Sequence, residues 1–238
     1  MSKRKAAEKG VLIFAAAFPT LAAWVYFDLF SGEPWMLALG VLSKVVQFSL
    51  PVVWVWLVLR QPLKIRGASG GGLLFGALSG LAILAACLGL YYGYLKGSAV
   101  FEGAPDRLGE KLTALGGDSL GGFLVIAVFY SVVHSFLEEY YWRWFVYGRA
   151  RQYLGPRAAS FFSSLAFMAH HVVVLNTFFP GDFWSVVVPL SLCVAIGGAI
   201  WSMVYERTGS LYGAWLSHAL VDVSIMICGW DMAFGGGS

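Results

Sequence analysis

Long runs of apolar residues, separated by short polar segments, dominate the pattern of this chain. Seven runs stand out, at about 11–30, 35–59, 72–95, 119–148, 158–179, 183–205 and 209–230. Each holds enough apolar residues to cross a hydrocarbon core of ~30 Å as a helix. None shows the alternation of apolar and polar residues that barrel strands would need. The pattern therefore predicts an all-α, polytopic transmembrane bundle of about seven spans. An eighth span or a re-entrant segment near 96–118 is the alternative.

Composition supports a membrane protein and excludes several other classes. The chain is 59% hydrophobic and 12% charged, whereas soluble domains carry about 25% charged residues. The net charge of +3 and the absence of long basic runs predict no nucleic-acid partner. Cys87, Cys193 and Cys228 all lie in apolar runs and are expected to be buried small hydrophobes. We expect an integral multi-pass protein of the cytoplasmic membrane in a bacterium or of the endoplasmic reticulum in a eukaryote, with the lipid bilayer as its surroundings.

The distribution of lysine and arginine predicts the direction of the spans. The segments 1–10, 60–70, 148–157 and 205–210 hold most of these residues and would share the inner side, with the N-terminus inside. No linker divides the chain, so we expect one membrane-embedded domain over 1–238, with a motif-bearing core at about 119–230. The glycine-rich end at 235–238 resembles an appended linker.

A short set of polar residues lies inside the apolar runs, where each ionisable group costs about 2.5–3.5 kcal/mol to insert. Small residues also recur in the third run, where Gly72, Gly76 and Gly80 share one helix face and predict close helix packing. The polar set comprises His134, Glu138, Glu139, Arg143, His170, His171, His218 and Asp222, with Lys44 and Gln47 in the second run.

Spacing and depth organise this set. Residues four apart are neighbours on a helix face, which predicts pairs of His134 with Glu138, Glu139 with Arg143, and His218 with Asp222. Glu138 and Glu139 point about 100° apart, so one can face a cavity while the other forms a structural ion pair with Arg143. The helical rise of ~1.5 Å per residue brings Glu138, His171 and His218 to similar depths in the membrane.

A carboxylate beside imidazoles in a partly dry cavity can activate water as a general base. Glu138, His171 and His218 would also make a plausible zinc set, although the helical H-E-x-x-H motif of zinc proteases is absent. No G-x-S-x-G motif indicates a serine nucleophile. Buried carboxylates and histidines serve transporters and proton relays as well, so a non-enzymatic membrane transporter is the competing hypothesis.

Three motifs in chain order give these residues a family context. "EEYYWR" fits E-E-x-x-x-R, "FMAHH" fits F-x-x-x-H, and "HALVD" fits H-x-x-x-N/D. Over Glu138 to Asp222 the chain resembles the CPBP family of intramembrane proteases, which includes the type II CAAX prenyl endopeptidases and the bacteriocin-processing or Abi-like proteins. The first three spans share only the general shape.

The resemblance implies an intramembrane endopeptidase of glutamic or metallo type, with Glu138 as the base that activates water and His171 assisting it. His218 and Asp222 would stabilise the oxyanion. Because an aspartate could donate to it only when protonated, the alternative is that Asp222 orients His218.

Glu139 and Arg143 complete the first motif, and His170 is expected to face away. His134 is expected to be either a packing residue or a partner that tunes Glu138. We expect a metal-free site, with zinc as the alternative. The expected substrate is a membrane-associated polypeptide, with a prenylated C-terminus or a leader or sorting signal. An inactive family member, serving as an immunity or scaffold protein, is a further alternative.

Overall fold

The computed structural model describes residues 3–29 and 35–235, so most of the predicted linker at 235–238 lies outside the described residues. Within them, seven helices are long and apolar enough to cross a membrane, which confirms the predicted spans. They are Arg4–Leu29, Met36–Val58, Gly70–Leu95, Leu120–Ala150, Pro156–Phe178, Phe183–Thr208 and Leu211–Phe234. Most residues in their apolar windows are not fully buried within the chain, as expected of helices surrounded by lipid. The protein is an integral, multi-pass membrane protein, and its N-in orientation stays a prediction.

The first three spans each change from α to π geometry near their ends. α1 (Lys3–Trp24) continues into η1 (Val25–Leu29), α2 (Met36–Val52) into η2 (Val53–Val58), and α3 (Gly70–Leu90) into η3 (Tyr91–Leu95). The change in α2 follows Pro51, which lacks the N–H that a regular α-helix would use.

The segment after the third span is not an eighth span. It contains the 3₁₀ turn η4 (Ala99–Phe101) and the helix α4 (Ala104–Ala114), which has 11 residues, whereas a span needs about 20. Arg107 of α4 donates a hydrogen bond from Nε to the carbonyl oxygen of Phe178 at 2.7 Å. This bond ties the short helix to the end of the fifth span.

The fourth span alternates between helix types at its polar residues. It runs through α5 (Leu120–Val128), η5 (Phe129–His134), α6 (Ser135–Glu139), η6 (Tyr140–Tyr147) and α7 (Gly148–Ala150). The two glutamates thus lie in a five-residue α segment with a π-helical segment on either side, and such π segments frequently occur at functional sites. The last three spans are α8 (Pro156–Phe178), η7 (Phe183–Val187) with α9 (Val188–Thr208), and α10 (Leu211–Phe234).

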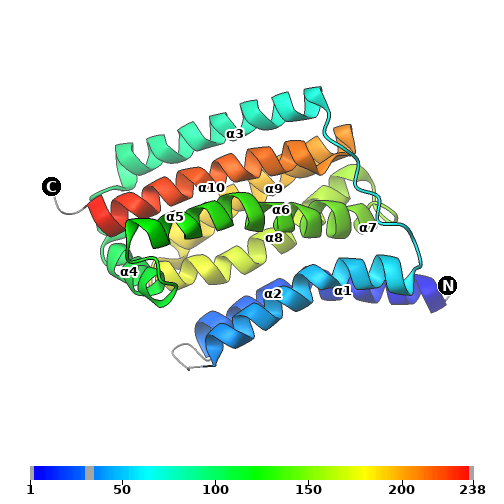
Figure 1. Ribbon diagram of the computed structural model, residues 1–238, viewed down its shortest axis with the longest axis horizontal. Coiled ribbons are helices and arrows are strands. Elements are labelled where there is room, and N and C mark those ends of the chain that lie inside the picture. The colour runs from blue at the N-terminus through cyan, green and yellow to red at the C-terminus, as the bar shows by residue number, and fades with distance from the viewer. Residues whose placement is uncertain (1–2, 30–34, 236–238) are drawn as a thin grey trace.

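The spans form one bundle in which α10 lies between α3 and the fourth span, while α1 and α2 lie together on the opposite side (Figure 1). The start of α1 and the end of α10 lie at opposite ends of the bundle, as an odd number of spans requires. Gly76 of α3 contacts the backbone of Gly213 so closely that a Cβ atom would overlap its carbonyl oxygen, and a Cβ atom at Gly80 would lie only 2.9 Å from the Cα atom of Ser217. The predicted packing role of these glycines is confirmed.

The most buried side chains gather around the fourth span. Tyr141, Trp142 and Phe145 of that span pack with Phe167 of α8 and Trp201 of α9. The buried aromatic core therefore surrounds the part of the chain that carries the polar motifs.

Candidate active site

Glu138 lies among imidazoles from three different spans. Its side chain is buried. The Nε2 atom of His134 lies 3.4 Å from Glu138 Oε1, that of His170 lies 3.6 Å from the same oxygen, and that of His218 lies 3.7 Å from Oε2. α8 and α10 thus deliver their histidines to the glutamate on α6, and the predicted pair of His134 and Glu138 is confirmed.

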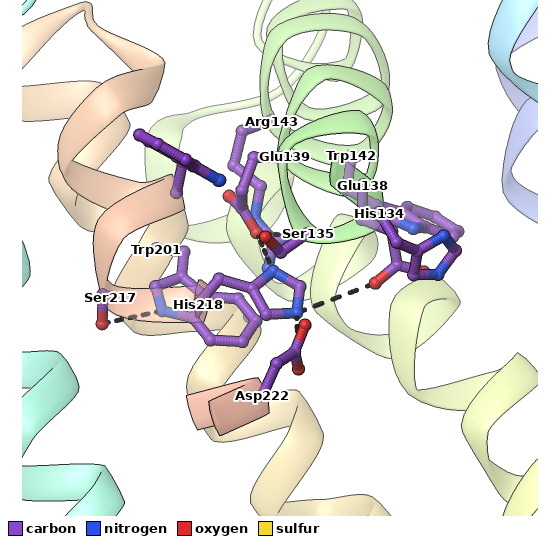
Figure 2. A network of polar contacts seen from close by, with 12 residues as sticks. His134, Ser135, Glu138, Glu139, Trp142, Arg143, Trp201, Ser217, His218 and Asp222 are labelled. Atoms are coloured by element: carbon purple, nitrogen blue, oxygen red, sulfur yellow. Dashed lines mark hydrogen bonds and ion pairs between the residues drawn. The ribbon is translucent and has the colours of Figure 1, made fainter. Parts of the chain in front are cut away.

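The His218 ring is held on several sides (Figure 2). Its Nδ1 atom lies 2.8 Å from Glu139 Oε1, and its Nε2 atom lies 3.6 Å from Asp222 Oδ1. The indole of Trp201 stacks on the ring with centroids 4.0 Å apart. Because a carboxylate can only accept, the Nδ1–H group donates to Glu139. The Nε2 atom is left facing Glu138 and Asp222.

Trp201 is itself held by a hydrogen-bonded chain that reaches the third span. Its Nε1 atom donates to Ser217 Oγ at 3.0 Å, and Ser79 Oγ donates to the same hydroxyl at 3.1 Å. α3, α9 and α10 therefore jointly fix the wall behind His218.

The predicted ion pair of Glu139 and Arg143 is confirmed, but Glu139 does more than neutralise the arginine. Arg143 Nη1 lies 3.1 Å from Glu139 Oε1, and both side chains are almost completely buried. The guanidinium also lies over the rings of Phe167 and Trp201, at 4.8 and 4.9 Å from their centroids. One carboxylate thus both compensates a buried cation and orients His218.

The expectation that His170 faces away is wrong. Its ring is buried, approaches Glu138 and stacks parallel to Trp142 with centroids 5.6 Å apart. The reason is rotational: neighbouring residues on a helix point about 100° apart, so the turn of α8 that carries both histidines can bring either one to the glutamate.

His171 lies beside His170, with ring centroids 4.1 Å apart. Its Nδ1 atom lies 2.9 Å from the carbonyl oxygen of Phe167. A carbonyl only accepts, so Nδ1 carries the proton and Nε2 of the neutral ring is an acceptor. His171 interacts electrostatically with Glu138 and His218. Its role in the reaction stays a prediction.

His134, Lys44 and Gln47 border the same region. The His134 ring lies between Phe48 and Tyr130, with centroids 6.0 and 5.2 Å away, as well as beside Glu138. It is therefore a packed side chain that also contacts the glutamate. Lys44 Nζ donates to Gln47 Oε1 at 3.3 Å.

The predicted zinc set does not come together as a ligand group. No three His, Cys, Asp or Glu side chains of residues 3–29 and 35–235 are arranged to hold a metal ion. His218 presents only Nε2, because Nδ1 is engaged by Glu139. The nearest groups to Glu138 include His170 rather than the predicted ligand His171.

Sequence reasoning missed two residues that shape the site. Trp201 and Ser217 form the wall behind His218, while Trp142 stacks against His170. A tryptophan in an apolar run gives no signal of this kind. Ser217 directly precedes His218 in the sequence, which was the only available hint.

A comparison with protein families matches the part of the chain that carries the candidate active site. Residues 120–224 match a family model described as type II CAAX prenyl endopeptidase Rce1-like. The match begins at α5 and ends within α10, so it contains both glutamates, all four histidines and Asp222 but leaves the first three spans outside. No curated protein and no solved structure matches the chain.

Proposed function

Because this chain belongs to the CPBP family, of which the type II CAAX prenyl endopeptidases are members, we propose that it is an intramembrane endopeptidase whose Glu138 activates water. At the level of the family, the activity is that of a CAAX-type protease within the membrane, which is a hydrolase. The proposed reaction cleaves a peptide bond in a membrane-associated polypeptide.

In the proposed mechanism each side chain has a defined role. Glu138 takes a proton from water, and the hydroxide oxygen forms a bond to the substrate carbonyl carbon. His171, whose Nε2 is an acceptor, holds the attacking water. His218, which carries a proton on both ring nitrogens in the proposed mechanism, donates from Nε2 to the oxyanion that develops while its Nδ1–H stays on Glu139, and Asp222 orients Nε2. When the C–N bond breaks, Glu138 returns the proton to the leaving amine.

One observation carries the proposal. Glu138 is buried inside a membrane-spanning helix and yet has three imidazoles within 3.4–3.7 Å, contributed by three spans. A purely structural carboxylate needs only one cation to compensate its charge, and Arg143 supplies such a cation to Glu139. An arrangement of several proton-exchanging groups is what general acid–base catalysis needs.

The test is the isosteric variant Glu138→Gln, which keeps the shape and removes the base. Purified wild-type protein in lipid nanodiscs should cleave a lipid-anchored peptide substrate, and E138Q should lose about 10²-fold or more in kcat. Thermal unfolding shows whether the variant is folded. If folded E138Q cleaves at the wild-type rate, the mechanism is wrong. If neither protein cleaves and E138Q abolishes ion or solute flux, the transporter hypothesis replaces it.

Metal dependence is tested separately. The proposed route is metal-free, so activity should persist after dialysis against a chelator, and purified protein should contain less than one zinc per chain. Loss of activity that zinc alone restores would assign the metalloprotease type instead.

A further inference from the structure

A lysine lies inside the second membrane span. Lys44 is eight residues from the start of the span Met36–Val58 and fourteen from its end. At ~1.5 Å per residue these separations correspond to about 12 and 21 Å. The residue is exposed on the surface of the described chain, while its Nζ atom lies over the ring of Phe48, 5.6 Å from the centroid. A cation at such a depth is costly and usually marks a functional group.

The hydrogen bonds around Lys44 leave several donors unused. Its Nζ atom donates to Gln47 Oε1 at 3.3 Å, and no carboxylate of the described residues lies within ion-pair distance of it. Gln47 is 2% exposed, and its Nε2 atom has no hydrogen-bond partner in that part of the chain. An ammonium group and a buried amide N–H₂ thus occur together within one turn of α2. Within the described residues the amide N–H₂ has no acceptor, and the ammonium group has Gln47 Oε1 as its only side-chain acceptor.

This pair lies beside the candidate active site. Phe48, one turn after Lys44, packs edge-on against His134 and Tyr141 of the fourth span, with centroids 6.0 and 6.2 Å apart. Lys44 interacts electrostatically with Glu138 and with His170. A ligand that reaches Lys44 therefore lies next to the proposed catalytic glutamate.

We propose that Lys44 and Gln47 bind the C-terminal carboxylate of the polypeptide substrate. Two carboxylate oxygens match the two sets of unused donors, and charge-assisted hydrogen bonds are the stronger kind. An extended tripeptide spans about 10 Å, so a carboxylate a few residues beyond the cleaved bond can reach the neighbouring helix. The depth of Lys44 disfavours a lipid phosphate, which stays near the membrane surface. This inference rests on the proposed function and adds the recognition of one substrate end.

The experiment compares two peptides of the same sequence and lipid anchor, one with a free C-terminal carboxylate and one with a C-terminal amide. In phosphatidylcholine nanodiscs the wild-type protein should favour the carboxylate by about tenfold or more in kcat/KM, because a hydrogen bond to a charged group is worth that much. Lys44→Met should bring the ratio close to one, mainly through KM. Lys44→Arg should keep the preference, and Gln47→Leu should reduce it in part.

Lys64→Met, which removes a lysine outside the spans, is the matched control and should keep the wild-type ratio. A wild-type ratio near one would overturn the proposal, as would a K44M variant that retains the preference. A third peptide carries an internal aspartate and an amidated C-terminus. If it is cleaved as well as the free acid, the position of the carboxylate does not matter and the proposal is overturned. Loss of the wild-type preference in phosphatidylglycerol nanodiscs would assign Lys44 to a lipid headgroup.

Binding separates this proposal from the proposed chemistry. Displacement of a fluorescent peptide by an uncleavable analogue, with the scissile amide reduced, reports on Lys44 even if cleavage does not depend on Glu138. A carboxylate preference in binding that K44M removes supports the recognition site. Equal binding of the acid and the amide by wild-type protein overturns it whatever the catalytic mechanism.

Discussion

Removing one partner of the buried pair Glu139 and Arg143 should destabilise the protein much more than removing both. The two side chains are 0% and 1% exposed, and their charged atoms lie 3.1 Å apart. Glu139→Met leaves a buried guanidinium without its carboxylate, and Arg143→Met leaves a carboxylate without its main cation. Each single variant should lose about 3–5 kcal/mol of unfolding free energy.

The double variant E139M/R143M removes both charges together. Replacing a buried ion pair by apolar residues of similar volume is often close to neutral. Here the stacking of Arg143 on Phe167 and Trp201 is lost as well, which costs about 0.5–2 kcal/mol. The double variant should therefore be at least about 1 kcal/mol more stable than either single variant.

The catalytic activity of the three variants E139M, R143M and E139M/R143M should not follow their unfolding free energies. His218 loses its 2.8 Å partner in both variants that lack Glu139, so folded E139M/R143M should still lose roughly 10²-fold or more in kcat, as when the group that orients a catalytic imidazole is removed. Stability is measured by unfolding in mixed micelles and activity by peptide cleavage in nanodiscs. Additive stability losses, or a double variant with wild-type activity, would refute this account of Glu139.

Three further outcomes are expected. His171→Ala should lower kcat by about 100-fold or more, and His170→Ala should lower kcat less. If His170→Ala has the larger effect in a cleavage assay, the assisting role belongs to His170. Asp222→Asn should keep activity within roughly tenfold, because the amide keeps a polar oxygen beside His218 Nε2, which lies 3.6 Å from Asp222 Oδ1. Asp222→Ala should lose more, and equal losses would argue against an orienting role. Gly76→Ala should lower the unfolding free energy by about 1–3 kcal/mol, because the new Cβ atom overlaps with α10. Gly89→Ala on the same helix should not, because a Cβ atom there meets nothing within 4 Å. Equal effects of the two substitutions on Tm would contradict close packing as the reason.

The spans and the pairs within one helix could be predicted from the sequence because both depend on local spacing. Apolar runs report span length directly, and a separation of four residues brings side chains such as His218 and Asp222 together whatever surrounds the helix. The π-helical segments around α6 could not be predicted, since the apolar pattern along the chain does not distinguish π from α geometry. The rotation of α8, which brings His170 rather than His171 into contact with Glu138, is also set by tertiary packing.

Contacts between helices were the part of the site that was hardest to predict from the sequence. Glu139 was predicted to pair with Arg143, but nothing in the spacing indicated that it would reach α10 and orient His218. The stack of Trp201 on His218 joins residues whose contact depends on how α9 crosses α10. Composition alone does not determine that crossing.

The hydrogen-bonded chain from α3 through α10 to Trp201 also bears on the order in which the protein is made. Ser79 and Ser217 are 138 residues apart, so α3 is synthesised and inserted long before the helix that carries His218. Until α10 docks on the Gly76 face, Glu138 and Glu139 are already in the membrane while the histidine that Glu139 orients is still missing. A hydrolase assembled in this order stays incomplete during its own synthesis, when neighbouring nascent chains would be the nearest polypeptides to cleave.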